Sequence, residues 1–249
     1  MTKRWAITVE YDGAGFSGWQ RQRESLTVQQ VLEEALTSFC GESVTLHVAG
    51  RTDAGVHALA QVAHFDLEKD TDEQTICGAM NHYVRPHAVT VLSAREVAPD
   101  FHARFSAQAR RYRYIVCNRK PPLALMRGRA WHVVAPLSLD SMRKAAKLLH
   151  GKHDFSTFRA SGCQANSPLR TLDSITVDQQ EDLFVFEAQA RSFLYHQVRN
   201  MVGSLTLVGA GQWNVDDFAQ AFAAADRTKG GLTAPADGLY FMRVFYDSH

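Results

Sequence analysis

One cation and one carboxylate, Arg51 and Asp53, stand two residues apart in this chain. Gly50 and Gly55 bracket the pair and permit a tight excursion of the backbone. Residues i and i+2 of an extended segment point to the same side, so both side chains can face one cleft. Loops at strand ends are where catalytic groups tend to lie. The structural alternative is a turn capped by Asp53, with Arg51 paired to it at the surface.

A second feature is the stretch from Phe101 to Leu139, which contains no acidic residue although the whole chain has a net charge of only +1. Tyr112, Tyr114 and Trp131 are interleaved with its basic residues. Those basic residues are Arg104, Arg110, Arg111, Arg113, Arg119, Lys120, Arg127 and Arg129. A segregated basic segment with aromatic residues is typical of a nucleic-acid contact. The alternative is an edge strand whose arginines guard it against aggregation.

The segments that must position these groups alternate between strand and helix patterns. The first half predicts strands at 5–11, 44–48, 61–67 and 89–97, from apolar residues at every second position. It predicts helices at 28–39, where Thr27 and Gln30 form a capping box, and at 72–83. The resulting order, β-α-β-β-α-β, is the ferredoxin-like pattern.

The second half repeats this order with one extra helix. Strands are predicted at 110–118, 172–179, 183–190 and 239–246. Helices are predicted at 139–149, within 193–209, and at 216–225 with Asn214 as the N-cap. We therefore expect an α+β fold of two ferredoxin-like halves that form a central antiparallel sheet with an active-site cleft between them. The expected division is 1–105, which carries the Asp53 loop, and 106–249.

Gly13, Gly15 and Gly18 match G-x-G-x-x-G and follow a predicted strand, so a dinucleotide-binding fold has to be considered. In that fold the third glycine opens a helix. Residues 19–25 are instead polar and without helical period, and the helix pattern starts only after Thr27. A nucleotide-dependent oxidoreductase is thus a competing function with an incomplete motif.

The composition, with 45% apolar and 21% charged residues among 249, is ordinary for a soluble globular protein with a sizeable core. No apolar run approaches the roughly 18 to 20 residues of a membrane helix. His150, His153 and Asp154 are close in sequence, but no further ligand cluster accompanies them, so no metal site is predicted. The cysteines form no C-x-x-C pair, which argues against a zinc knuckle and suits a reducing cytoplasm. They are Cys40, Cys77, Cys117 and Cys163.

Five motifs follow one another along nearly the whole chain: YDG with FSGWQ (11–20), GRTDAGVHA (50–58), ARRYRY (109–114), FLYHQVRNMVG (193–203) and APADGLY (234–240). Together these segments resemble the TruA family of tRNA pseudouridine synthases. The resemblance implies an isomerase that converts uridine to pseudouridine in the tRNA anticodon arm, at tRNA positions 38, 39 and 40. It also implies a homodimer and chemistry without a cofactor.

The resemblance assigns roles to residues of both halves. Asp53 is the nucleophile, which attacks either C1′ or C6 of the nucleotide. Arg51 helps to extrude the target base. Arg199 pairs with the catalytic carboxylate and keeps it ionised; by its sequence alone it could equally be a surface arginine of a helix.

Tyr112 is implied to stack on the target uracil and to handle the proton at C5. Its alternative is a core tyrosine, a role that Tyr114 on the same face could also fill. Arg110, Arg111 and Arg113 are candidate phosphate contacts, although alternation along a strand cannot point all three into one groove. A non-catalytic RNA-binding module is the other competitor. Such sheets use exposed aromatic residues on central strands, whereas here the distinctive residues lie in a loop.

Overall fold

The computed structural model describes residues 2–247, which form two compact units. The first unit contains the chain up to Gln108 and again from Tyr240 onward; the second contains Ala109–Leu239. The sequence-based division at 105/106 differs from this at the C-terminal strand, which it placed in the second half. That strand joins the first unit because Tyr240 and Phe241 pair with His57 and Ala58.

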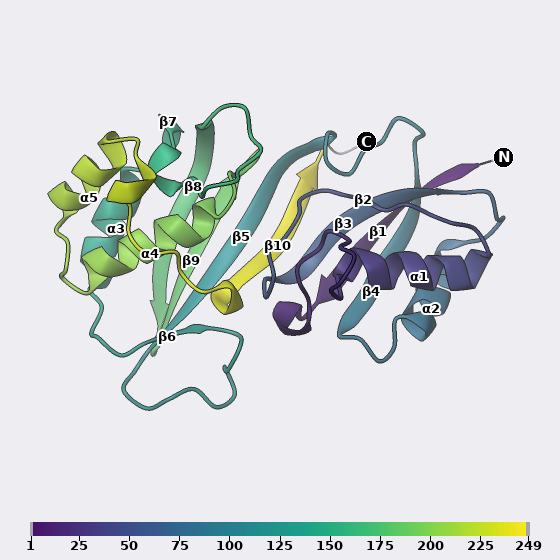
Figure 1. Cartoon of the computed structure of the whole chain (residues 1–249), viewed down its shortest axis with the longest axis horizontal. Coiled ribbons are helices and arrows are strands. Elements are labelled where there is room, and N and C mark those ends of the chain that lie inside the picture. The colour runs from purple at the N-terminus through teal and green to yellow at the C-terminus, as the bar shows by residue number, and fades with distance from the viewer. Residues whose placement is uncertain (1, 248–249) are drawn as a thin grey trace. The chain divides into compact units, whose positions relative to one another are not determined.

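The first unit alternates strands and helices in the predicted order (Figure 1). Its elements are β1 (Lys3–Tyr11), a 3-10 turn η1 (Gly13–Gly15), α1 (Val28–Cys40), β2 (His47–Val48), β3 (His57–Leu67), α2 (Glu73–Tyr83), β4 (Val89–Val97) and β10 (Leu239–Tyr246). Strand β1 lies antiparallel between β3 and β4. The other edge of β3 pairs with β10, in parallel, at His57 and with β2 at His64.

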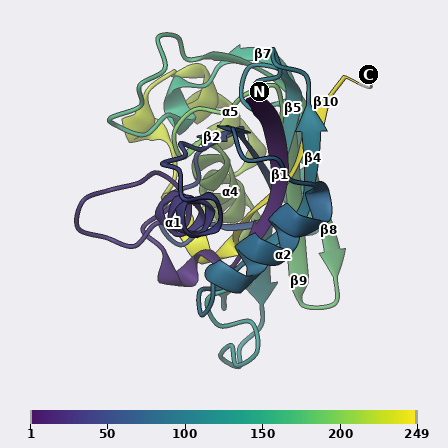
Figure 2. The same ribbon diagram turned by 90° about the vertical axis from the view of Figure 1, so that its right-hand side faces the viewer.

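Alternation in β1 builds the core of this unit. Trp5, Ile7 and Val9 are buried on one face, opposite Phe65 and Ala63 of β3. Helix α1 packs beside α2, and α2 packs on β4 (Figure 2). The predicted cap of α1 is confirmed in part: the Thr27 side chain accepts from the main-chain N–H of Gln30, whose own side chain binds Glu34 instead of completing a capping box.

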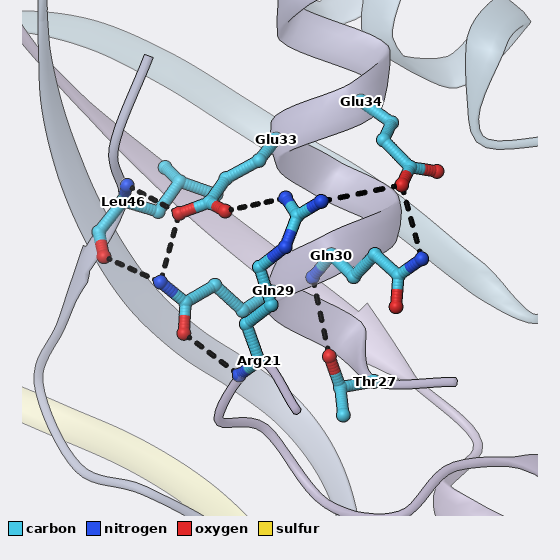
Figure 3. A network of polar contacts seen from close by, with 7 residues as sticks. All are labelled: Arg21, Thr27, Gln29, Gln30, Glu33, Glu34 and Leu46. Atoms are coloured by element: carbon cyan, nitrogen blue, oxygen red, sulfur yellow. Dashed lines mark hydrogen bonds and ion pairs between the residues drawn. The ribbon is translucent and has the colours of Figure 1, made fainter. Parts of the chain in front are cut away.

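A buried carboxylate explains why β2 is shorter than the predicted strand at 44–48. Glu33 Oε1 accepts hydrogen bonds from the main-chain N–H of Leu46, at 3.0 Å, and from Gln29 Nε2, at 2.8 Å (Figure 3). Gln29 Nε2 also donates to the carbonyl oxygen of Leu46. Side chains of α1 thus bind the backbone here, so a strand ladder forms only at His47 and Val48. Arg21 joins the same carboxylate and fixes the loop before α1.

The second unit combines an antiparallel sheet with helices. Its elements are β5 (Ala107–Asn118), β6 (Trp131–Val133), α3 (Leu139–Lys147), β7 (Gly151–Asp154), η2 (Ser156–Phe158), β8 (Leu169–Gln180), β9 (Leu183–Ala190), α4 (Gln197–Gly209), α5 (Val215–Ala223), η3 (Arg227–Lys229) and η4 (Ala236–Gly238). Strands β5, β9, β8 and β7 are antiparallel neighbours in that order, and β6 pairs in parallel with β5. Asn214 caps α5 in a full capping box with Asp217. The fold is therefore mixed α+β with mostly antiparallel strands, as predicted.

Among the described residues, no helix is both long and apolar enough to cross a membrane. All four cysteines are free thiols, and only Cys117 is buried.

Candidate active site

The Asp53 loop, defined here as residues 49–56, connects β2 to β3 and is held by groups from elsewhere in the first unit. The hydroxyl of Tyr11 lies 2.7 Å from Thr52 Oγ1. The main-chain N–H of Trp19 donates to the oxygen of Thr52, and Gln61 Nε2 donates to that of Gly50. Burial raises the pKa of Tyr11 to about 12, so its hydroxyl keeps its proton at neutral pH. The backbone around Asp53 is thereby fixed.

The glycine-rich segment at 13–18 packs directly on this loop. Gly18 has φ +88°, and a Cβ at this position would lie 2.7 Å from the main-chain oxygen of Thr52. A Cβ on Gly13 would overlap the main-chain oxygen of Val56. These glycines permit a close approach of two backbones. No helix opens at Gly18, since α1 begins at Val28, so the dinucleotide-binding alternative lacks its structural context.

The side chains of the loop alternate in exposure. Thr52 is buried toward Tyr11, whereas Arg51 is exposed and Asp53 is partly exposed. Asp53 is accordingly partly exposed, while hydrogen bonds hold the backbone of the residues around it. This combination suits a carboxylate that must meet a substrate without moving.

His57, at the end of the loop, was not singled out from the sequence. Its Nδ1 accepts from the main-chain N–H of Gly13 at 3.0 Å and lies 3.1 Å from Asp12 Oδ1. Its ring stacks on Tyr240, with centroids 4.8 Å apart. His57 therefore ties the start of β3 to η1 and to β10. Its place four residues after Asp53 in GRTDAGVHA was the available signal.

Strand β5 of the second unit carries both Tyr112 and Tyr114, and their surroundings distinguish the roles that the sequence alone did not assign. Tyr114 is fully buried and donates to the carbonyl oxygen of Pro235 at 2.7 Å, and burial raises the pKa of its phenol. Tyr112 is partly exposed, and the edge of its ring meets Phe193 at 5.1 Å between centroids. Tyr114 is thus a structural residue, and Tyr112 presents part of its ring for contact.

The three arginines around Tyr112 lie on different faces of β5. Arg110 shares the face of Tyr112, is 8% exposed, and donates to the carbonyl oxygen of Arg191. Arg111 and Arg113 point to the opposite face. There they bind their cross-strand neighbours, Gln189 at 2.8 Å and Glu187 at 2.7 Å. The structure therefore does not bring the three together.

Arg199 lies in the first turn of α4. Its Nε donates to the carbonyl oxygen of Ala234 at 2.8 Å, and Nη1 lies 3.1 Å from Nε2 of His196. The main-chain oxygen of Arg199 accepts from the N–H of Ala234. The guanidinium is thus held in one orientation, unlike a mobile surface arginine.

The histidines near β7 do not assemble a metal site in the described part of the chain. His153 Nε2 lies 2.8 Å from the carbonyl oxygen of His150, so this ring nitrogen is engaged with the backbone. Across residues 2–247, no three His, Cys, Asp or Glu side chains are grouped so that they could hold an ion.

The family model and the curated relatives that match this chain point to the same family. The sequence model of a family described as tRNA pseudouridine synthase matches residues 7–106 and 145–247. The chain is 52% identical over 244 residues to tRNA pseudouridine synthase A of Rhodospirillum centenum, covering 98% of this chain and 100% of that one. It is 53% identical over 245 residues to that of Paramagnetospirillum magneticum, covering 98% and 96%. The solved Cbf5-Nop10-Gar1 complex aligns with a TM-score of 0.39 and 12% identity, over 95% of this chain and 48% of that chain, which is too low to add to the fold.

Proposed function

The chain belongs to the family of tRNA pseudouridine synthases, isomerases that act on tRNA, and we propose that Asp53 is its nucleophile and the anticodon arm its target. The proposed sites are uridines 38, 39 and 40. The observation that supports the catalytic assignment is the Asp53 loop, in which Asp53 is partly exposed while Tyr11 binds the Thr52 side chain and Trp19 and Gln61 bind the backbone.

The reaction itself needs few groups. The C1′–N1 glycosidic bond breaks, the base rotates, and C1′ bonds to C5. The hydrogen on C5 leaves as a proton, and N1 gains one, so the product is an isomer and no electrons are exchanged. One carboxylate can serve as the nucleophile, by attack at C1′ or at C6. This balance requires neither a redox cofactor nor an activated donor.

Other residues are proposed to prepare the uridine for this chemistry. Tyr112 stacks on the uracil and acts on the C5 proton, and its partly exposed ring against Phe193 supports that role. Arg51 holds the extruded nucleotide, consistent with its exposure in the loop. Arg199 pairs with Asp53, and its fixed guanidinium supports this role.

We further propose contacts with tRNA phosphates by Arg110, Arg111 and Arg113. Arg110 shares the face of Tyr112, whereas the other two would have to meet the RNA along the opposite face. Because Arg111 and Arg113 already bind Gln189 and Glu187, an RNA contact must replace or extend those bonds. The three are thus unequal candidates: Arg110 shares the face of Tyr112, but it is 8% exposed and bonded to the Arg191 carbonyl oxygen, so it too must be released to meet a phosphate.

We also propose that the chain has two ferredoxin-like halves, that it forms a homodimer and that it acts in the cytoplasm. The element order of the first unit and its strand order β4-β1-β3-β2 support the first point. The four free thiols suit the cytoplasm. Light scattering of the purified protein, alone and with tRNA, tests the dimer.

Release of tritium from tRNA labelled at C5 of uridine tests the reaction directly, because isomerisation must free that hydrogen. We expect release by the wild type and none by Asp53→Asn, with pseudouridine mapped to positions 38–40 of the product. Binding of tRNA without release by the wild type would contradict the proposal and favour a non-catalytic RNA-binding module. Release with product at other positions would contradict the anticodon-arm target alone.

A further inference from the structure

A short turn after β4, residues 101–106 and here called the platform turn, is anchored from three strands of the first unit. Arg4 of β1 donates from Nη1 to the carbonyl oxygen of Phe101 at 3.0 Å. The main-chain N–H of Ala103 donates to Nδ1 of His64 on β3 at 3.1 Å, and its oxygen accepts from the hydroxyl of Tyr246 on β10 at 2.8 Å. The turn is therefore tied to the sheet by three hydrogen bonds.

The platform turn is also bonded within itself, around His102. Nδ1 of His102 accepts from the main-chain N–H groups of Arg104, at 3.1 Å, and of Phe105, at 3.4 Å. Ser106 closes the turn, since its N–H donates to the oxygen of His102 and its hydroxyl accepts from the His102 N–H. The backbone that carries Phe105 is thus held by seven hydrogen bonds, three to the strands and four within the turn, and not by burial of Phe105 itself.

The Phe105 side chain nevertheless projects outward and is 70% exposed. Its ring lies 4.3 Å from that of His102, which in turn lies 4.6 Å from that of His64. The guanidinium of Arg104 lies 5.6 Å from the centroid of the Phe105 ring. What sets Phe105 apart from other exposed apolar residues is its setting: an exposed aromatic face on an anchored backbone, with a histidine ring on one side and a guanidinium on the other.

The residues around Phe105 indicate which kind of ligand would bind there. The platform turn begins the stretch at 101–139 that has no acidic residue; Asp100 precedes it and Asp66 is paired with its anchor Arg4, so the cation beside the Phe105 ring is Arg104. A flat apolar ring beside a guanidinium matches a nucleobase and its adjoining phosphate. We propose that Phe105 is a stacking platform for an unpaired base of the tRNA substrate, and that Arg104 contacts a neighbouring phosphate.

The proposal rests on tRNA being the substrate and adds a contact beyond the one proposed for Tyr112 with the target uracil. Phe105 touches no reacting atom in this scheme, so its contribution is to affinity. An aromatic residue on an anchored backbone loses only its own two side-chain torsions, and no loop freedom, when a base stacks on it. Any unpaired base can occupy it, since every base presents a π-face.

Binding of tRNA to Phe105→Ala, Phe105→Trp and Tyr83→Ala tests the platform. Tyr83 is the matched control, because it is also an aromatic residue of the first unit that is exposed, at 46%, beside a histidine. Loss of one base–aromatic stack should weaken binding roughly 5- to 100-fold in Phe105→Ala. Phe105→Trp should bind within a few-fold of the wild type, and Tyr83→Ala should be unchanged.

Two further measurements test whether a base stacks on Phe105 and whether Arg104 contacts a phosphate. The added fluorescence of Phe105→Trp, relative to the wild type, should be quenched when tRNA or a short single-stranded RNA is added. Arg104→Gln should lower the slope of log affinity against log salt by roughly one unit, while Phe105→Ala leaves that slope unchanged.

Unchanged affinity in Phe105→Ala, with an unchanged melting temperature, would overturn the proposal. So would a changed oligomeric state of Phe105→Ala in light scattering, because Phe105 would then be a contact between copies of the chain. These experiments measure tRNA affinity and do not depend on isomerisation. A failure to isomerise anticodon-arm uridines would therefore leave the platform result intact, and a silent Phe105→Ala would leave the isomerase proposal intact.

Discussion

The Asp53 loop and strand β5 present their side chains by different means. The loop takes its shape from residues outside it: Tyr11 binds the Thr52 side chain, and Trp19 and Gln61 bind its backbone. Strand β5 needs only its register with β9, after which alternation places Tyr112 on one face and Arg113 on the other. A loop of this kind is sensitive to changes outside it, whereas a strand position is sensitive mainly to its own side chain.

The largest effect should come from the loop's own carboxylate. We expect Asp53→Asn to reduce single-turnover isomerisation by roughly a thousandfold or more, because an amide cannot replace the nucleophile. Affinity for tRNA and the melting temperature should change little, since Asp53 is partly exposed and the backbone is fixed by its neighbours. Residual turnover within tenfold of the wild type would remove Asp53 from the reaction.

A glycine outside the loop tests its dependence on remote contacts. At Gly18 a methyl group meets the Thr52 oxygen at 2.7 Å and the backbone has φ +88°, so Gly18→Ala should cost roughly 2 to 4 kcal/mol of unfolding free energy. It should also slow turnover, because the backbone beside Asp53 must shift. Gly15→Ala is the matched control, since nothing lies within 4 Å of a Cβ there. Urea unfolding and single-turnover assays compare them; equal stability for the two variants would show that the close approach is unimportant.

On β5 the comparison is between Tyr112→Phe and Tyr114→Phe. Tyr112→Phe should bind tRNA normally yet turn over about a hundredfold more slowly, if its hydroxyl helps to remove the C5 proton. Tyr114→Phe should retain turnover and lose about 1 kcal/mol of stability with its bond to Pro235. Turnover rates at saturating tRNA should reveal the defect of Tyr112→Phe, and thermal melts should reveal that of Tyr114→Phe. A fully active Tyr112→Phe would leave that residue only a stacking or packing role.

Sequence patterns predicted the regular part of this fold well. The strand at 239–246 was placed with the observed bounds, and Asn214 caps α5 as expected. Alternation in β5 also predicted that its arginines could not share one groove, which the opposite faces of Arg110 and Arg113 confirm. These features depend on neighbours in sequence, so their periodicity is visible in the sequence.

Features made by long-range contacts were missed. Strands β6 and β7 have three and four residues and no periodic signal, and they exist only through pairing with β5 and β8. The shortening of β2 depends on Glu33, thirteen positions before Leu46. Gly18 was considered as part of a phosphate-binding motif, whereas its role is close packing on Thr52. The sequence does not show which distant backbone a glycine will meet.

The smallest effect concerns the two faces of β5. Arg113 binds Glu187 at 2.7 Å, an ion pair in which both side chains are partly exposed and which is therefore worth at most about 1 kcal/mol. If RNA follows the face of Tyr112, Arg110→Gln should lower the salt slope of binding by roughly one unit, and Arg113→Gln should leave it unchanged.

Glu187→Gln makes this test independent of any loss of packing, because it releases Arg113 from its partner without removing the arginine. When Arg113 does not meet RNA, the added net positive charge should strengthen binding only slightly, and less so at high salt. When Arg113 does meet a phosphate, its release should tighten binding several-fold, and the double variant Arg113→Gln with Glu187→Gln should lose that gain. We expect the first outcome. The second would place part of the RNA on the Arg111 and Arg113 face, and the two faces of β5 would then both be binding surfaces.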